Sequence, residues 1–407
     1  MLSKLHRVTN FMHQQYKNVP IYIIGFLVML MAFQQLPIIR ETYYDTIRLL
    51  LYGSFAVLIL YSILNLNILL KFKVYWMFVL IIVYALLVSL SIYLFDGDLY
   101  PILLYIVPFG IITISIANRY NNREIMLLLW MYAMSNLVLG IANIFYYGNG
   151  FEVTRLVPEK NQIGPMIGYS ILIFIFFVKH YKYMLLKVMS FGLVLVSFFT
   201  LLAISNRSAI VGVTIMMIFM MLYVIFLGIK KLLSNNKKEV FIATGIMMAI
   251  VLIGLQFEFI QTLMDTFWTS ITYNHIITDL NALSSGRIQL IEDSFVWIKT
   301  YPLFGFIGVE SIPISEYTHV FILHTWMQYG LLGSLPFLLF YLFFVLIIIK
   351  ILFNIEKDVF SILVFMLLSV SYVISLLEYS YPYGPGVSQF ILWMMLGQYV
   401  LRDKKHA

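Results

Sequence analysis

The sequence predicts an all-α polytopic membrane protein, with about twelve transmembrane helices and one large extracytoplasmic loop. Of its 407 residues, 62% are hydrophobic and only 11% are charged, whereas a soluble globular protein carries about 25% charged residues. Apolar runs of about 20 residues, which is the length that crosses a bilayer as a helix, recur along the whole chain. We therefore predict a single integral membrane domain over residues 1–407.

The apolar runs give the order of the predicted spans. They occupy residues 20–37, 47–70, 74–95, 99–117, 124–147, 162–178, 184–204, 208–229, 240–260, 319–349, 359–377 and 385–401. The run at 319–349 is too long for one crossing. We expect a short interfacial or tilted entry before a span that begins near Gly330.

The distribution of lysine and arginine predicts the orientation. If the N-terminus is inside and the spans alternate, 19 of the 26 basic residues fall in inside segments, and every inside loop holds at least two. This positive-inside pattern predicts that both termini are cytoplasmic. The basic N-terminus is interpreted as a cytoplasmic tail rather than a cleaved signal. The net charge of +7 is scattered between spans, so no nucleic-acid partner is predicted.

The connection at 261–318 is predicted to be extracytoplasmic, and it contains a helical pattern. Ile288, Ile291, Phe295 and Ile298 recur at helical spacing, which predicts a helix over about 286–300 that ends before Pro302. We expect this helix to lie on the outer membrane surface, with its apolar side toward lipid or toward the spans.

Two arginines stand out by position. Arg287 falls in the first turn of the predicted surface helix, where a positive charge opposes the helix dipole by about 0.3–1 kcal/mol. A helix start combined with a guanidinium suits an anion, and contact with lipid headgroups is the alternative. Arg207 is the only charged residue between Lys187 and Lys230. It is expected at the outer membrane boundary, either snorkelling or facing the interior of the bundle.

Two histidines begin the next apolar run. A neutral imidazole accepts a proton from a hydroxyl near neutral pH, so His319 is a candidate base, although an interfacial histidine is the alternative. His324 follows about 140° further round a helix, so the two are not expected to share one face. Asp96 and Asp98 could hold a divalent cation, but two aspartates in a short loop are more typical of a solvated turn, so neither a metal nor a cofactor is predicted. The chain has no cysteine, which excludes disulfides and thiolate chemistry.

Four segments, in this order, resemble signatures of the bacterial O-antigen polymerase and ligase family, whose polymerases are of the Wzy type. They are "EKNQIGPMIGYS", "AISNRSAIVGV", the loop segment "SGRIQLIEDSFVWIKTYPLFGFIG" with its P-x-x-G close, and "HVFILHTWMQYGLLG". The resemblance covers about 155–340. Val320 stands where the family usually has asparagine, and Gln328 stands at a position that is often acidic. These departures leave the group that orients His319 unidentified.

The resemblance implies a membrane glycosyltransferase at the outer leaflet of the bacterial cytoplasmic (inner) membrane. We expect it to be metal-independent, because the sequence shows no convincing ligand cluster beyond Asp96 and Asp98 and two arginines can replace a cation at the diphosphate. Its substrate would be an undecaprenyl-diphosphate-linked oligosaccharide, and its product O-antigen, capsular polysaccharide or exopolysaccharide. Membrane lipids, a chain-length regulator and a flippase are the further partners implied. The site residues expected on this basis are His319, Arg287 and Arg207 for catalysis, and Asn161, Gln162, Lys160 and His324 for substrate binding.

Three functions remain open at this point. The first is a polymerase that joins lipid-linked repeat units, and the second is a ligase that moves the finished glycan to an acceptor lipid. The third is a flippase that exports the lipid-linked unit. A transporter of this size is expected to show two repeated halves with broken helices and ionisable residues at mid-membrane. The sequence shows no internal repeat, and its polar groups gather in one loop, which favours an enzyme.

Overall fold

The computed structural model describes most of the predicted spans. The described residues are 19–63, 100–118, 120–148, 157–235, 286–306, 318–354, 359–379 and 389–403, with scattered helical positions between 79 and 94 and between 261 and 269. Within these parts every regular element is a helix. The predicted all-α class is therefore confirmed.

The helices follow the predicted spans closely. They are α2 (Val19–Gln34), α3 (Pro37–Ile63), α6 (Tyr100–Asn118), α7 (Asn122–Tyr147), α8 (Lys160–His180), α9 (Met184–Ile204), α10 (Arg207–Asn235), α14 (Arg287–Thr300), α15 (Phe321–Asn354), α16 (Val359–Ser375) and α17 (Phe390–Asp403). The predicted span 240–260 lies outside the described residues, and 74–95 is described only in part. The count of twelve spans therefore stays a prediction.

Five of the described helices are long and apolar enough to cross a membrane. They are Pro37–Ser62, Asn122–Tyr147, Lys160–His180, Met184–Ile204 and Phe321–Phe353, and five shorter apolar helices accompany them. The chain is thus an all-α protein with several helices suited to a bilayer. The side of the membrane on which each terminus lies stays a prediction.

The helix α3 begins ten residues earlier than the predicted span at 47. The connection from α2 is only the short turn at Gln35 and Leu36, where Leu36 N–H donates to Phe33 O over 3.0 Å. Pro37 suits the first helical position because its φ is already helical and it has no N–H to satisfy. The residues that follow include the polar side chains of Arg40 and Glu41, and for this reason the predicted span begins only at residue 47.

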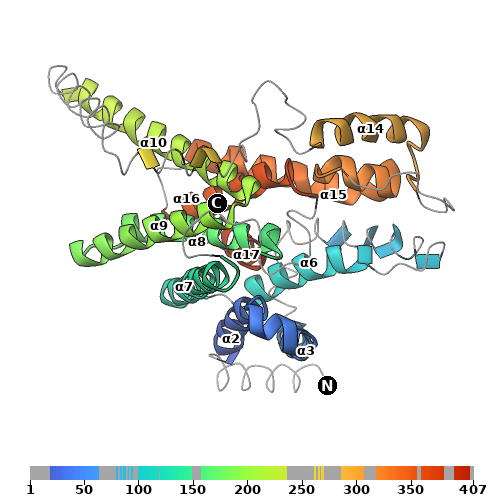
Figure 1. The fold of residues 1–407 in the computed structure, drawn as a ribbon, viewed down its shortest axis with the longest axis horizontal. Coiled ribbons are helices and arrows are strands. Elements are labelled where there is room, and N and C mark those ends of the chain that lie inside the picture. Colours follow the sequence, from blue (N-terminus) through green and yellow to red (C-terminus); the bar gives the residue numbers. More distant parts are fainter. Residues whose placement is uncertain are drawn as a thin grey trace, which may run out of the picture.

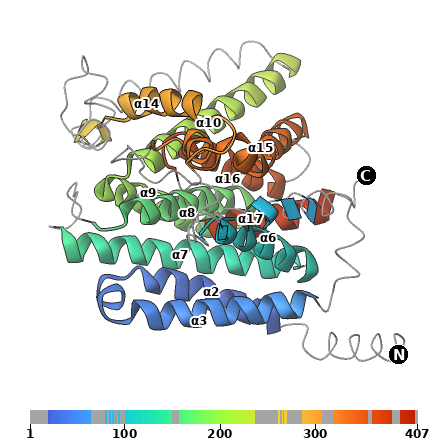
Figure 2. The same ribbon diagram turned by 90° about the vertical axis from the view of Figure 1, so that its right-hand side faces the viewer.

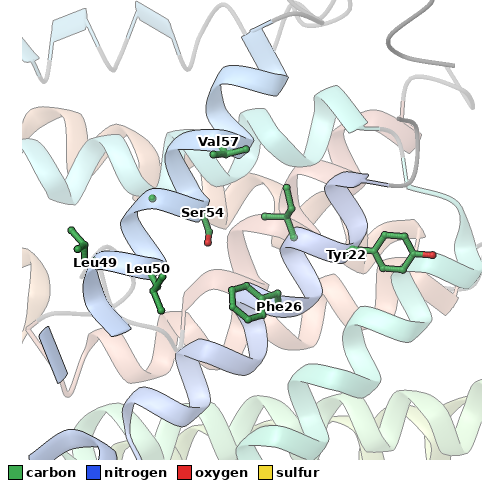
Figure 3. Close-up of a pocket in the computed structure, with 8 residues that line it drawn as sticks. Tyr22, Phe26, Leu49, Leu50, Ser54 and Val57 are labelled. Carbon is green, nitrogen blue, oxygen red and sulfur yellow. The ribbon is translucent and has the colours of Figure 1, made fainter. Parts of the chain in front are cut away.

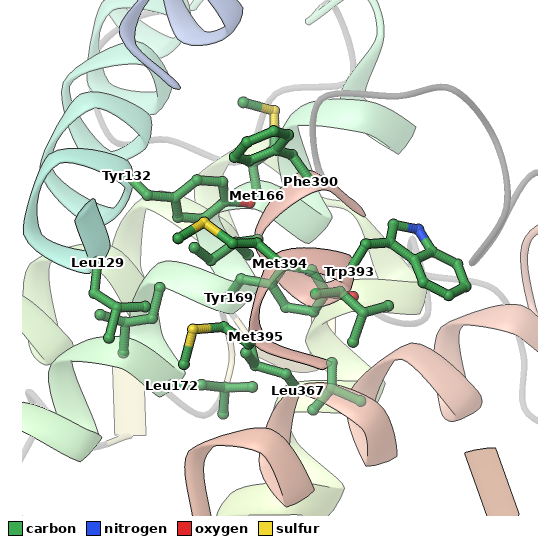
Figure 4. Packing of buried hydrophobic residues seen from close by; sticks show 14 of the residues in the cluster. Leu129, Tyr132, Met166, Tyr169, Leu172, Leu367, Phe390, Trp393, Met394 and Met395 are labelled. Carbon is green, nitrogen blue, oxygen red and sulfur yellow. The ribbon is translucent and has the colours of Figure 1, made fainter. Parts of the chain in front are cut away.

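The helix α8 lies at the centre of the assembly. Of its apolar window, 78% is buried, compared with 11% for α3. Met166, Tyr169 and Leu172 of α8 pack between Leu129 and Tyr132 of α7, Leu367 of α16, and the α17 side chains Phe390, Trp393, Met394 and Met395 (Figure 4). These contacts place the start of α8 next to the ends of several neighbouring helices.

The helices α2 and α3 lie on the opposite side of the molecule from α14 (Figures 1 and 2). An open groove of about 520 Å³ lies between α2 and α3 (Figure 3). It is lined by Tyr22, Ile23, Phe26, Leu49, Leu50, Gly53, Ser54 and Val57. An apolar outer surface of this kind is expected of helices that face lipid, because lipid tails are as apolar as the side chains.

The helix α14 confirms the helix predicted at 286–300, but its packed side differs from the predicted stripe. Ile298 is buried with Phe306 and with Met327 of α15, whereas Ile288 and Phe295 are 37% and 50% exposed. The position of α15 decides which side of α14 is covered, and apolar spacing alone does not show where a neighbouring helix lies.

The helix α15 is broken at Gly330, near the position where the sequence predicted the start of the span. Gly330 has φ 67° and ψ −176°, which interrupts the helix after Tyr329. The turn at 301–306 fills the break: Leu331 N–H donates to Pro302 O over 2.9 Å, and Leu332 N–H donates to Leu303 O over 3.2 Å. In return, Phe306 N–H donates to Gln328 O over 3.1 Å. The P-x-x-G segment is therefore a backbone cap for the second half of α15.

Candidate active site

A buried carboxylate lies where four segments meet. Glu378 stands three residues beyond the end of α16 and is 3% exposed. Its Oε1 accepts a hydrogen bond from Ser208 Oγ at 3.2 Å, and Arg287 Nη2 lies 3.4 Å from the same oxygen. Its Oε2 lies 4.0 Å from His319 Nδ1. The carboxylate thus faces α10, α14 and the segment that leads into α15.

Arg287 is the first residue of α14, and Gly286 before it has φ 80°. Its Nη1 donates to the backbone oxygen of Leu377 over 2.7 Å, in addition to the contact with Glu378. The sequence predicted that a positive charge at a helix start would need an anion. The protein supplies negative charge itself, through the Glu378 carboxylate and a carbonyl that follows α16.

The turn between α9 and α10 is organised by Asn206. Ser205 takes a left-handed conformation with φ 59°. Asn206 Oδ1 then accepts from Ala209 N–H at 2.8 Å and from Ser208 Oγ at 3.0 Å, which is the arrangement of a helix N-cap. Asn206 Nδ2 donates to Asn161 Oδ1 over 3.0 Å. One asparagine therefore caps α10 and fixes the start of α8.

These contacts form a continuous group, which we call the Glu378 cluster. Its members are Asn161, Asn206, Ser208, Arg287, His319 and Glu378. They come from α8, the turn between α9 and α10, α10 itself, α14, the segment before α15 and the segment after α16. Three of the residues predicted for the site, Asn161, Arg287 and His319, are members.

His319 lies just before α15, which begins at Phe321, and its side chain is 33% exposed. Its ring centroid is 6.2 Å from that of Tyr379, and the His324 ring centroid is 4.8 Å from the same tyrosine. The expectation that the two histidines do not share a face was wrong. The helical spacing does not apply to His319, because it precedes the helix.

The other predicted site residues lie around the cluster. Arg207, partly buried, stands in the chain between Asn206 and Ser208, at the first position of α10. Lys160 begins α8, and its charge acts on Glu378. Gln162 instead accepts a hydrogen bond from Gln35 Nε2 over 3.4 Å, at the α2 side of α8. Gln162 therefore contacts the neighbouring helix pair, and no contact of the described residues links it directly to Glu378.

Burial controls the ionisation of Glu378. Loss of solvent around the carboxyl raises its pKa above the ordinary value, and the positive charge of Arg287 is the largest influence that opposes this rise. The hydrogen bonds from Ser208 and Arg287 and the charge of Lys160 also oppose it. Burial thus favours the protonated carboxyl, and the neighbouring positive charges and hydrogen bonds favour the carboxylate, so the ionisation of Glu378 depends on these neighbours.

Sequence reasoning missed Glu378, although a signal for it was present. Glu378 is the only charged residue between Asp358 and Arg402. The same argument, a lone charge at the end of an apolar span, singled out Arg207. It would have found Glu378 if it had been applied to acidic residues as well.

The prediction that no metal is bound concerned Asp96 and Asp98 in particular. Asp96 and Asp98 lie outside the described residues. Within the described parts of the chain, no three histidine, aspartate or glutamate side chains are grouped as metal ligands would be.

No model of a protein family matches the chain, and no curated protein matches it significantly. The class defined by the fold and the cluster is an all-α protein with membrane-suited helices and a buried ionic site at one end of the bundle.

Proposed function

We propose that the protein is a membrane glycosyltransferase that polymerises undecaprenyl-diphosphate-linked oligosaccharide units into O-antigen, capsular polysaccharide or exopolysaccharide. The proposal places the reaction at the outer leaflet of the bacterial cytoplasmic membrane. The observation that supports it best is that Arg287 and His319, distant in the sequence, both face one buried carboxylate. One site then contains a cation, Arg287, for the leaving phosphate and a base, His319, for the attacking hydroxyl.

In the proposed reaction, a hydroxyl oxygen of the acceptor glycan attacks the anomeric carbon of the donor sugar. The bond from that carbon to the phosphate oxygen breaks, and undecaprenyl diphosphate leaves with the bonding electrons. His319 takes the proton of the attacking hydroxyl. Arg287 and Arg207 stabilise the negative charge that develops on the diphosphate. Asn161, Lys160 and His324 line the approach as substrate-binding groups, and Gln162 supports the start of α8.

The exposure of the side chains fits these roles. Glu378 is buried, whereas the side chains of Arg287 and His319 are 23% and 33% exposed. The two groups assigned to the substrate are therefore open to solvent on one side and held by the protein on the other. A partly buried site strengthens charge interactions with a diphosphate, because the effective dielectric constant is lower than in water.

One observation bears on the flippase alternative. Transporters often contain broken helices whose free ends bind the cargo, and α15 is broken at Gly330. Here, however, the freed N–H groups of Leu331 and Leu332 are already bonded to Pro302 and Leu303. The break therefore has a structural partner, and we favour the enzyme.

The test is a reaction of the purified protein, in lipid nanodiscs, with the lipid-linked repeat unit as sole substrate. A ladder of longer glycans supports polymerisation. Product that forms only after an acceptor lipid is added indicates the ligase. No covalent change in either mixture contradicts a glycosyltransferase, and uptake of the intact lipid-linked unit to the other leaflet would then indicate a flippase.

A further inference from the structure

We propose that Glu378 exchanges partners during the reaction: it pairs with Arg287 in the empty site, and it pairs with His319 once a diphosphate has taken Arg287. This inference rests on the proposed function, because it assumes that Arg287 binds the donor diphosphate. It makes Glu378 a positioning residue that couples donor binding to the base.

The two carboxylate oxygens are already divided between the two partners. Oε1 carries the contacts with Ser208 Oγ, at 3.2 Å, and with Arg287 Nη2, at 3.4 Å. Oε2 lies 4.0 Å from His319 Nδ1, which is within ion-pair range and beyond a hydrogen bond. Closing that gap to a hydrogen bond requires a shift of about 1 Å. The single proton of the Ser208 hydroxyl is shared between Asn206 Oδ1 and Glu378 Oε1, and this contact with Oε1 does not pass through Arg287.

Competition between anions drives the exchange. A diphosphate carries more negative charge than a carboxylate, and its oxygens match a guanidinium in two parallel hydrogen bonds. When Arg287 turns to it, the buried Glu378 carboxylate loses the charge that opposed its protonation. A buried carboxylate without a charged partner is costly, and His319, whose Nδ1 lies 4.0 Å from Oε2, can become positively charged and take the place of Arg287.

The consequence for His319 is a defined tautomer and greater basicity. When the proton of the neutral ring is on Nδ1 and points to Glu378, the lone pair is on Nε2, and Nε2 is the atom that accepts the proton of the acceptor hydroxyl. The carboxylate then stabilises the imidazolium that forms. Before the donor binds, Arg287 competes for the same carboxylate, and His319 is a weaker base. Activation of the acceptor therefore depends on the presence of the donor.

The other charged and titratable groups around the pair do not provide this coupling. Lys160 of α8 acts on Glu378 as a second, more distant positive charge. Arg207 adjoins Ser208 on α10, and the rings of His324 and Tyr379 lie near His319 on its other side. Of Ser208 and Arg287, which hydrogen-bond to the carboxylate, Arg287 is the charged one and the one assigned to the substrate.

The experiment follows His319 directly by NMR in the full-length protein. The seven histidines are labelled with ¹⁵N in the ring, and the His319 signal is identified by its loss in His319→Gln. Its pKa is measured with and without methylenediphosphonate, a stable diphosphate, and binding of the probe is followed by ³¹P NMR. We expect the probe to raise the pKa of His319 by about one unit or more in the wild type. In Glu378→Gln the probe should raise the pKa of His319 clearly less. The rise that is left in this variant is the direct electrostatic effect of the probe on His319.

Two further variants make the result specific. Arg287→Gln imitates the loss of the arginine to the ligand, so His319 should already show the raised pKa without probe, and added probe should change it little. Glu159→Gln is the matched control: Glu159 pairs with Arg40 over 2.8 Å outside the Glu378 cluster, and the rise should equal that of the wild type. Equal rises in the wild type and Glu378→Gln, or no binding of the probe to the wild type, would overturn the exchange.

A kinetic measurement separates this inference from the proposed function. In glycan synthesis, Glu378→Gln should lower kcat about ten-fold or more, leave KM for the donor nearly unchanged, and displace the acidic limb of the pH profile to lower pH. If the wild type makes no glycan, the proposed function fails while the NMR result stands on its own. If glycan is made and the acidic limb is the same in Glu378→Gln, only the exchange fails.

Discussion

Gly164 and Asn206 lie in direct contact, so the start of α8 is packed against the turn between α9 and α10. A Cβ on Gly164 would come within 2.8 Å of Asn206 Oδ1 and would lie still closer to Asn206 Cβ. Asn206 in turn holds Asn161 over 3.0 Å. The absence of a side chain at 164 is therefore a condition for the Glu378 cluster.

We expect Gly164→Ala to destabilise the protein by about 1–3 kcal/mol, because the added methyl overpacks the contact with Asn206. Urea unfolding in detergent measures the change. Gly192→Ala is the matched control within α9, where nothing lies within 4 Å of the added Cβ. In an open helical position alanine should stabilise by about 0.4–1 kcal/mol. Similar effects of the two substitutions would show that the close contact is unimportant.

Gly330→Ala and Gly305→Ala should both release the turn at 301–306 from α15. Both glycines have positive φ, and a Cβ on either would lie closer than 3.0 Å to backbone atoms of the opposite segment. Gly286→Ala separates the two causes: Gly286 has φ 80°, but nothing lies within 4 Å. Gly286→Ala should destabilise the protein only by the cost of placing alanine in a left-handed backbone conformation, about 1–2 kcal/mol. Hydrogen exchange at Leu331 and Leu332 should rise in the first two variants and stay unchanged in the third.

Arg287→Ala and Arg207→Ala should each lower glycan transfer on the order of 10²–10³-fold, which is the usual loss for one group that stabilises developing charge. Arg287→Ala should also weaken binding of the lipid-linked donor, whereas His319→Ala should still bind it. Single-turnover assays and donor binding measure these effects. Arg40→Ala removes an exposed ion pair outside the cluster and should cost about 0–1 kcal/mol of stability with transfer retained. Normal glycan lengths in both cluster arginine variants would refute the assignment.

The pH dependence of stability should reveal the burial of Glu378. Its pKa is raised in the folded state above the ordinary value of 4.5. A carboxyl group whose pKa is higher in the folded state stabilises that state while the group is protonated. This contribution is lost as pH rises through the folded-state pKa. The free energy of unfolding of the wild type, relative to Glu378→Gln, should therefore fall as pH rises from below 4.5. A difference that is constant, or that grows with pH, would contradict this.

Glycan transfer should continue in EDTA. Two arginines provide the positive charge for the diphosphate in the proposed reaction, so a divalent cation is not required. The assay compares initial rates in EDTA with rates in added magnesium or manganese. A rate that EDTA abolishes and either metal restores would show that this expectation is wrong.

Much of the fold could be predicted because it depends on local properties of the chain. Long apolar runs define α7, α8 and α9 within a few residues of their observed ends. The excess length of the run at 319–349 predicted an entry segment before a span that begins near Gly330, where α15 is broken. The spacing from Ile288 to Ile298 predicted the helix α14, although not the side on which α15 covers it.

The cluster could be predicted only in part, because its contacts join residues that are far apart in the chain. The resemblance to known signatures singled out Asn161, Arg287 and His319, but no signature included Glu378. The contact between Glu378 and Arg287 spans 91 positions, and that between Ser208 and Glu378 spans 170. Only the packing of α10 and α16 against α8, together with the contact of Arg287 at the start of α14 with the segment after α16, brings them together.

The capped break in α15 also has a consequence for synthesis and membrane insertion. The acceptor carbonyls of Pro302 and Leu303 precede the donors of Leu331 and Leu332 in the chain, so they leave the ribosome first. An unsatisfied backbone N–H costs several kcal/mol in hydrocarbon. When the second half of α15 enters the bilayer, the partners for its first N–H groups have already been made. The translocation machinery therefore receives this helix with its cap already synthesised, and not as an open end that must wait for a later segment.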